Sequence, residues 1–304
     1  MKNALLKMHV AVFLWGFTGI LGRAISLQEY PLVWYRTGIT AIIFYFILHY
    51  RKEFVPISRS ELLRFARIGS VISIHWVAFY GSIKYANASI ALTCLATAGI
   101  FTAIIEPMVL KTKFSLKEMS IGFIALIGMY FIYHFEIRFA IGIGLGILAS
   151  VLSSVFTIMN KKIVNDYPAR MVAFYEIGSG FIFLSLLLPI YLYYFPQTRL
   201  MPTTSDFGYL FILSLCCTVW GQSLALSALK KLSSFTTILM VNLEPVYGIF
   251  LAILFYHENK DLGIGFYIGI SLIACSVLLH TLGMSWENNR TRKQNLGNDI
   301  EIGL

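Results

Sequence analysis

Ten long apolar segments, joined by short connectors, fill almost the whole of this 304-residue chain. A stretch of about 18 or more largely uncharged residues can cross the hydrocarbon core of a bilayer as a helix, because a helix bonds its backbone polar groups within the segment. No remaining stretch is long enough to form a sizeable water-soluble domain. The sequence therefore predicts an all-α membrane protein with ten transmembrane helices. The predicted segments are 8–27, 32–50, 65–84, 88–110, 116–134, 140–160, 169–194, 207–229, 233–256 and 263–284.

Basic residues are distributed unevenly between the two ends of these segments. The chain has 24 Lys and Arg residues and a net charge of +9, which by itself would also suit a nucleic-acid-binding protein. With a cytoplasmic N-terminus, eighteen of the basic residues fall at inward ends and connectors and only five at outward ends. This asymmetry follows the positive-inside rule. We therefore expect a multi-pass protein of the cell membrane with both termini in the cytoplasm and no nucleic-acid partner.

The two halves of the chain contain similar residues in the same order. Tyr35-Arg36-Thr37-Gly38 corresponds to Tyr175-Glu176-Ile177-Gly178, 140 residues later, and Trp76 corresponds to Trp220, 144 residues later. Five segments in each half is an odd number, so the second half must cross the membrane in the opposite sense to the first. The pattern predicts two inverted five-helix repeats, an arrangement typical of transporters. The predicted units are a first half over 1–136, a second half over 137–285 and a polar cytoplasmic tail over 286–304.

Two Glu-Pro motifs lie inside apolar segments, as Glu106-Pro107 and Glu244-Pro245. Proline removes a backbone donor, so the carbonyls of Ala103 and Val241 should each lose a helical partner. The motifs are 138 residues apart, whereas the neighbouring segments repeat at about 143–145, so we predict that they are not equivalent. Both glutamates should face the protein interior. The alternative for each is a structural role, with the carboxyl bonded to nearby backbone.

Three short motifs lie where one membrane-protein family has them: Leu14-Trp15-Gly16, Leu243-Glu244-Pro245 and Glu258. On these motifs the chain resembles the drug/metabolite transporter (DMT) superfamily, in its EamA-type drug/metabolite exporter branch, over about residues 8–284. Ala98-Gly99 stands in the first half where the family pattern has a proline. The resemblance implies a secondary transporter that moves amino acids or related small metabolites across the cytoplasmic membrane, export included, by alternating access.

Polar and aromatic side chains near the middle of several segments are candidates for contact with a solute. They offer stacking faces and a few hydrogen-bonding groups, which suit a small amphipathic molecule. We expect a cavity between the halves near the midplane, lined by the first, third, fourth, sixth, eighth and ninth segments. The alternative is ordinary hydrogen bonding and packing between helices. The candidate substrate-binding residues are Trp15, His75, Trp76, Tyr80, Thr97, Trp220, Gln222 and Asn242.

Charged residues within the segments are candidates for coupling or gating. An ionised carboxyl near mid-bilayer costs about 2–3 kcal/mol or more. Glu244, near the middle of its segment, is therefore the first candidate for a proton-binding group, ahead of His75 and Glu106. The alternative is that Glu244 only stabilises the helix break. Arg36 and Glu176 occupy equivalent places, and inversion of the repeat puts Arg36 toward the outer side and Glu176 toward the inner side.

Motifs for enzymatic chemistry are incomplete or missing. His257-Glu258 begins a zinc-binding H-E-x-x-H pattern, but residue 261 is Asp, and the sequence contains no P-loop. The four cysteines lie in apolar segments without metal-ligand spacing. We predict a small-molecule solute and membrane lipid as partners, with no metal and no cofactor, and leave the oligomeric state open. An intramembrane enzyme, a lipid-handling protein and a channel remain as alternatives. The glycines expected to allow close helix packing include Gly142, Gly144 and Gly146.

Overall fold

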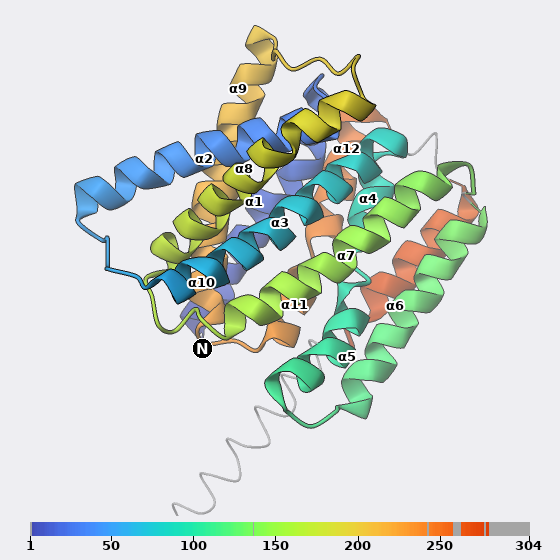
Figure 1. Cartoon of the computed structure of the whole chain (residues 1–304). Helices are drawn as coiled ribbons and strands as arrows, with labels where there is room; N and C mark the ends of the chain where they lie inside the picture. The colour runs from blue at the N-terminus through green and yellow to red at the C-terminus, as the bar shows by residue number, and fades with distance from the viewer. Residues whose placement is uncertain (1, 136, 242, 258–262, 277, 280–304) are drawn as a thin grey trace, which may run out of the picture.

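The structure is a computed structural model and describes every residue except 1, 136, 242, 258–262, 277 and 280–304 (Figure 1). All regular structure in the described residues is helical. The elements are α1 (Lys2–Ala24), α2 (Glu29–Arg51), α3 (Arg59–Tyr85), α4 (Ala88–Leu95), α5 (Ala98–Leu110), α6 (Leu116–Phe135), η1 (Ile137–Phe139), α7 (Ala140–Lys161), α8 (Ala169–Tyr194), α9 (Thr204–Ile212), η2 (Leu213–Trp220), α10 (Gly221–Leu229), α11 (Ser234–Val241), α12 (Glu244–Tyr256) and an unlabelled helix, Ile264–Ser276.

Each of the ten predicted apolar segments falls on helix where the structure describes it, and the end of the tenth, from residue 280, lies outside the described residues. Eight helical stretches in the described residues are long and apolar enough to cross a membrane. The predicted start of the third segment is wrong, because α3 begins at Arg59 rather than near residue 65. The cause is a capping box, in which Ser58 Oγ accepts from the backbone N–H of Glu61 and the Glu61 carboxylate accepts from the backbone N–H of Ser58.

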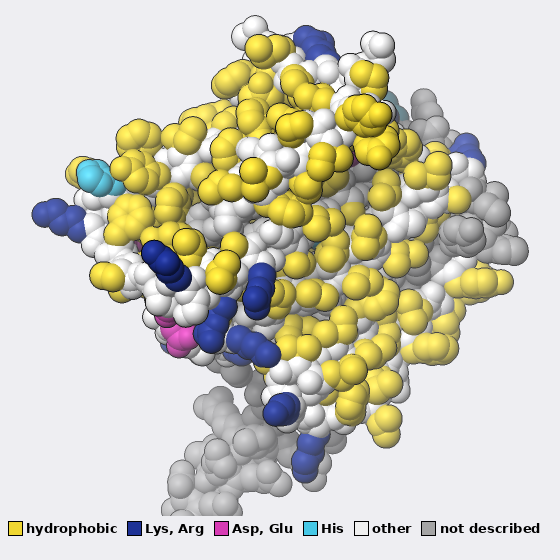
Figure 2. Space-filling model, viewed as in Figure 1, with side chains coloured by type: hydrophobic (Ala, Val, Ile, Leu, Met, Phe, Trp, Pro, Cys, Tyr) yellow, Lys and Arg dark blue, Asp and Glu magenta, His cyan; other side chains and the backbone are white. Residues whose placement is uncertain are grey.

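The outer surface of the bundle is apolar, as a multi-pass membrane protein requires. Phe46, Leu186 and Phe250 are each more than 60% exposed, and Figure 2 shows hydrophobic side chains over most of one face. Lys and Arg side chains gather toward the lower left of that face. The last turn of α2 with Arg51 and the first turn of α3 with Arg59 lie on the same side of the molecule (Figure 1). Such an apolar belt bounded by charge is rare on water-soluble proteins.

Two spans are broken at the same relative position. The fourth segment divides into α4, with 8 residues, and α5, with 13, and the ninth divides into α11 and α12 with the same lengths. Residues just after α5 and α12, Lys111 and His257, both have left-handed backbones, with φ of 55° and 53°. The break in the fourth segment does not occur at Pro107, which lies inside the continuous helix α5. It occurs at Ala96 and Thr97 instead.

The first helix of each half packs on the broken span of the other half. Helix α1 contacts α10 and α12, and α7 contacts α3, α4 and α5. These contacts are close because small residues lie at the crossings: a Cβ added at Gly16 would lie 2.7 Å from Tyr247 Cβ, and one at Gly146 would lie 2.6 Å from Cys94 Cβ. The two halves therefore interlock through α1 and α7.

The eighth span contains a wider helical turn that the sequence analysis did not predict. Residues of η2 form a π-helix between α9 and α10, and Thr218 Oγ1 donates to the carbonyl of Leu213, five residues back. In the same turn, the carbonyl of Cys217 accepts a hydrogen bond of 2.8 Å from Trp15 Nε1 of α1. Such wide turns leave backbone groups available to partners outside the helix and occur often at functional sites.

Candidate functional site

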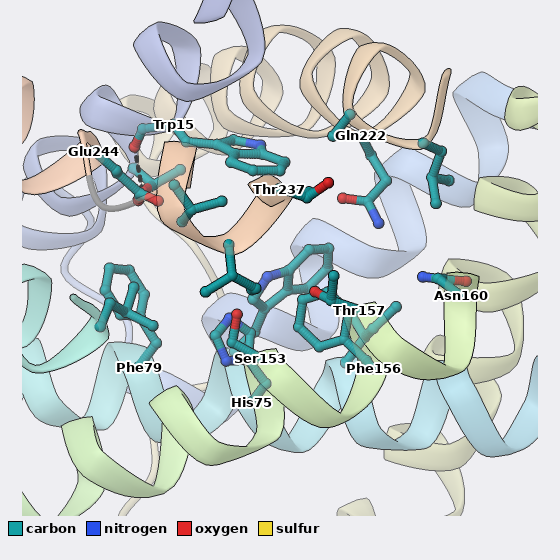
Figure 3. Close-up of a pocket in the computed structure, with 18 of the residues that line it drawn as sticks. Trp15, His75, Phe79, Ser153, Phe156, Thr157, Asn160, Gln222, Thr237 and Glu244 are labelled. Carbon is teal, nitrogen blue, oxygen red and sulfur yellow. Dashed lines mark hydrogen bonds between the residues drawn. The ribbon is translucent and has the colours of Figure 1, made fainter. Parts of the chain in front are cut away.

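A cavity lies between the two halves of the bundle. Helices α1 to α4 line it from the first half, and α7, α10, α11 and α12 line it from the second (Figure 3). The six segments expected around the cavity are confirmed as its walls, and α2 is an additional one. The space open to the centres of water molecules is about 80 Å³, and by that measure one water needs about 10–15 Å³. The cavity can therefore hold several waters or part of a small solute.

One end of the cavity carries a carboxyl beside a helix break. Glu244 is the first residue of α12 and is only 5% exposed. Its Oε1 lies 3.2 Å from Thr18 Oγ1 of α1, and that hydroxyl oxygen also lies 2.5 Å from the Trp15 carbonyl oxygen (Figure 3). A carboxylate would accept from Thr18, and a protonated carboxyl could donate to it, so this contact is compatible with either charge state.

A buried guanidinium lies in the wall of the same cavity. Arg36 of α2 is 2% exposed, and its Nε donates to Thr218 Oγ1 at 2.9 Å. Its Nη1 donates to the Tyr80 hydroxyl at 2.8 Å, and its Cζ lies 3.9 Å from the centroid of the Trp76 ring. Arg36 was predicted to lie toward the outer side of the membrane, but its long side chain reaches the central cavity.

The imidazole of His75 lies beside the cavity with one ring nitrogen hydrogen-bonded to the backbone. Its Nδ1 lies 2.7 Å from the carbonyl oxygen of Ala149 in α7. A carbonyl can only accept, so Nδ1 carries the hydrogen and Nε2 is the acceptor in the neutral ring. The ring also packs edge-on against Phe156, with centroids 5.3 Å apart. This contact links α3 to α7 beside the cavity.

A polar stripe on α7 was missed by the sequence analysis. Ser153, Thr157 and Asn160 line the cavity from this helix, opposite Gln222 and Thr237 of the second half's other helices (Figure 3). Their spacing of four and then three residues places all three on one face of a helix. That spacing within an apolar segment was the signal that could have identified them.

The predicted substrate-binding residues are therefore divided. Trp15, His75, Trp76 and Gln222 line the cavity. Asn242 is outside the residues that the structure describes. Three others, Tyr80, Thr97 and Trp220, are not among the lining residues.

Each of these three has another environment. Tyr80 is fully buried, and its hydroxyl accepts a hydrogen bond from Arg36. Thr97 lies in the break between α4 and α5, where it donates to the Cys94 carbonyl and contacts Ser150 Oγ at 3.0 Å. Trp220 is 53% exposed on the outer surface. Residues two apart on a helix lie on different faces, so Trp220 points away when Gln222 faces the cavity.

Two predicted coupling residues also lie outside the cavity lining. Glu106 accepts from the backbone N–H groups of Ser234 and Phe235 at 3.1 and 2.9 Å and so caps the first turn of α11. Glu176 is fully buried in α8, where one carboxyl oxygen accepts from Asn160 Nδ2 at 3.4 Å. Glu106 thus has the structural contact that the alternative interpretation described.

No group of three or more His, Cys, Asp or Glu side chains that could hold a metal ion occurs among the described residues.

Comparison with known proteins identifies a family. A model of the EamA-like transporter family matches the chain twice, over residues 2–134 and 140–282. No curated protein sequence matches significantly. One solved crystal structure of a protein superimposes with a TM-score of 0.69 at 13% sequence identity, covering 92% of this chain and 98% of that one. At that identity the superposition supports the fold alone.

Proposed function

The chain belongs to the EamA-like transporter family, and from this premise we propose that it is a secondary transporter moving small solutes across the cell membrane by alternating access. The family consists of transporters, so an intramembrane enzyme is no longer an alternative. The observation that supports the mechanism best is the central cavity, whose walls come from both halves and include both broken spans. A site between two halves can face either side of a membrane when the halves move relative to each other.

We further propose that the chain forms ten transmembrane helices in two inverted five-helix repeats, over 1–136 and 137–285. The equal division of the two broken spans supports this arrangement. The reciprocal packing of α1 and α7 supports it too, since each is the first helix of its half. The break before Glu244 then corresponds to the break before Ala98, 146 residues earlier. On this alignment the two Glu-Pro motifs are not equivalent.

Contacts on either side of the cavity are candidates for the gates. On one side, Asp206 of α9 accepts from Ser26 N and Ser26 Oγ, both at 2.7 Å, and so joins α9 to the connector after α1. On the other side, Arg170 pairs with Glu53 at 2.6 Å. All of these contacts link the first half to the second. Alternating access requires one set to open while the other stays closed.

Solute uptake by proteoliposomes tests the proposal. Purified protein is reconstituted, and a panel of labelled carboxylates, amines, amides and amino acids is offered with and without an imposed proton gradient. A transporter should show saturable uptake of a chemically unchanged solute and exchange it for unlabelled solute inside. A channel would give uptake that does not saturate and no such exchange. Failure to move any member of the panel would count against the proposal.

Thiol labelling tests the proposed orientation, with both termini in the cytoplasm. The native Cys275 is exposed and Cys216 is partly exposed, so both are first replaced by serine. With only the buried Cys94 and Cys217 remaining, a cysteine introduced at the exposed position of Arg59 should then be protected from a membrane-impermeant reagent in intact cells, and one introduced at Arg199 should react. The reverse pattern would invert the topology.

Glu244 is our proposed proton-coupling residue. It lies in the cavity wall at the N-terminus of α12, and its contact with Thr18 can form in either charge state. Its hydration should change as the cavity opens and closes, and the free energy of ionising a carboxyl depends strongly on hydration. The alternative, facilitated diffusion with Glu244 stabilising the break, predicts no response to a proton gradient.

A further inference from the structure

Arg36 is a buried cation whose direct partners are neutral. Within the described part of the chain its hydrogen bonds go to the hydroxyls of Thr218 and Tyr80, and its face lies on the Trp76 ring. No described carboxylate forms an ion pair with it; the one such pair between described residues joins Arg170 and Glu53. Charged side chains inside membrane proteins usually have a counter-charge, because hydroxyls and rings offset only part of the lost hydration.

The guanidinium also has donors to spare. It carries five N–H groups, and the described residues accept hydrogen bonds from Nε and from one N–H of Nη1. The remaining donors belong to a side chain that lines the cavity. An arginine that is buried, fixed and incompletely bonded is a ready site for an anion from the cavity.

The same contacts fix the direction of the guanidinium. Thr218 holds it from η2, Tyr80 holds it from α3, and the Trp76 ring supports its face. A planar guanidinium held in this way loses little conformational entropy when it binds an anion. Its paired N–H groups match the two oxygens of a carboxylate. Because η2 belongs to the second half and α3 to the first, the guanidinium contacts both halves.

The rest of the wall indicates which anion fits. Ile72, Phe79, Phe156 and Leu226 supply apolar and aromatic surface for an organic remainder. Phosphate carries about −1.5 to −2 charges near neutral pH, which one guanidinium would not balance. Glu244 in the same wall would add to the excess negative charge whenever it is ionised. When Glu244 is protonated, one carboxylate balances the one cation.

We propose that Arg36 is the anion-binding residue of the central cavity and that the transported solute carries a carboxylate. This inference rests on the proposed transport function and specifies its substrate class. A carboxylate should displace water beside the guanidinium and form charge-assisted hydrogen bonds with its free N–H groups, while the organic part packs on the aromatic wall.

Matched pairs of solutes test this proposal by binding alone. The probes are acetate, isobutyrate, benzoate and phenylacetate, each beside its primary amide, which has the same shape and no charge. Binding to detergent-purified protein is followed by quenching of tryptophan fluorescence, since Trp15 and Trp76 line the cavity. At least one carboxylate should bind about tenfold or more tightly than its amide, as expected for hydrogen bonds to a charged group.

The preference should depend on Arg36. Arg36→Gln should reduce it to about twofold or less, within the effect of an ordinary neutral contact. Arg199→Gln is the matched control, because Arg199 is exposed and bonds the carbonyl of Met201 in its own connector. If Arg36→Gln does not fold, Arg36→Lys keeps the charge without the planar guanidinium and should still weaken carboxylate binding several-fold relative to amide binding.

Three results would overturn the inference: no carboxylate preferred over its amide, a preference that survives Arg36→Gln, or unchanged affinities in Arg36→Lys. The proteoliposome assay separates this failure from failure of the proposed function. Uptake of neutral or cationic solutes alone would leave transport intact and remove the anion site. Carboxylate binding that depends on Arg36, without uptake of any solute, would support the anion site and contradict the proposed transport function.

Discussion

The two broken spans have the same backbone plan and different chemistry. Each divides into 8 and 13 residues, and each ends on a left-handed residue, Lys111 or His257. At the first break, Thr97 donates a hydrogen bond to the Cys94 carbonyl and contacts Ser150 of α7. The second break presents Glu244 to the cavity. A repeated fold thus supplies two similar breaks, and a substitution at one of them supplies a carboxyl.

A second pair of equivalent positions differs in the same way. Arg36 and Glu176 each lie seven residues after the first residue of their helices, α2 and α8, and both are buried. Arg36 reaches the cavity, whereas Glu176 bonds Asn160, which lines the cavity in its place. The cationic group therefore comes from the first half and the carboxyl from the second.

The largest expected effect is the loss of coupling in Glu244→Gln. Glutamine keeps the size and hydrogen-bonding groups of the side chain but cannot bind and release a proton near neutral pH. The variant should still exchange labelled for unlabelled solute across proteoliposomes, but it should not accumulate solute after an imposed pH step. Accumulation equal to that of the wild type would show that Glu244 is not the coupling group.

Glu106→Gln is the matched control for that experiment. It changes the other Glu-Pro motif, whose carboxyl caps α11 and does not line the cavity. This variant should accumulate solute as the wild type does. Loss of coupling in both variants would mean that the two motifs share a role in spite of their different positions.

The packing of the two halves predicts the next effect, a loss of stability in Gly146→Ala and Gly16→Ala. An added methyl group would meet Cys94 Cβ at 2.6 Å in the first case and Tyr247 Cβ at 2.7 Å in the second. Overpacking of this kind costs about 1–3 kcal/mol. Both variants should unfold at lower temperature in detergent, by similar amounts if the halves pack alike.

Gly144→Ala is the control on the same helix, because nothing lies within 4 Å of its added Cβ. Alanine favours helix over glycine by about 1 kcal/mol. This variant should therefore be as stable as the wild type or slightly more stable. A decrease as large as that of Gly146→Ala would indicate a general intolerance of α7 to substitution.

A smaller effect is expected when the cap of α11 is removed. Glu106→Ala leaves the N–H groups of Ser234 and Phe235 without the carboxylate that accepts from them. Loss of a helix cap costs about 0.5–2 kcal/mol. The unfolding temperature should fall moderately in the same detergent assay, while solute accumulation persists. The second half has no counterpart of Glu106, since Ala252 lies 146 residues later.

Much of the fold could be predicted from the sequence, because hydrocarbon requires long apolar helices and leaves little freedom in their length. The break at Ala96 and Thr97 could not, since no proline or glycine occupies either position and Thr97 contacts Ser150 of α7, 53 residues away in the sequence. The π-helical turn in η2 likewise contacts a residue far away in the sequence, Trp15 of α1. Neither contact can be predicted from the residues nearby in the sequence.

The candidate site was predictable in part for a related reason. Polarity in an apolar segment indicated His75 and Gln222 as solute-contacting residues and Glu244 as a carboxyl facing the interior, and all three line the cavity. It did not show how far a long side chain reaches, so Arg36 was expected at the outer side rather than at the cavity. Segment depth also says nothing about which face of the helix a residue occupies.

The smallest effect on solute uptake is expected from a substitution at Trp220. This substitution tests which face of the eighth span Trp220 occupies. The repeat pairs Trp220 with Trp76, yet Trp76 is 8% exposed and lines the cavity beneath Arg36, whereas Trp220 is 53% exposed. An exposed side chain on the lipid side contributes little to a cavity on the other face, so Trp220→Leu should change the KM for solute uptake by about twofold or less, as expected of a surface substitution. Trp76→Leu should raise KM several-fold in the same vesicles, because it removes the ring that supports the guanidinium. Equal effects of the two substitutions would mean that both tryptophans reach the solute during transport, and that Trp220 turns inward in a second conformation of the eighth span.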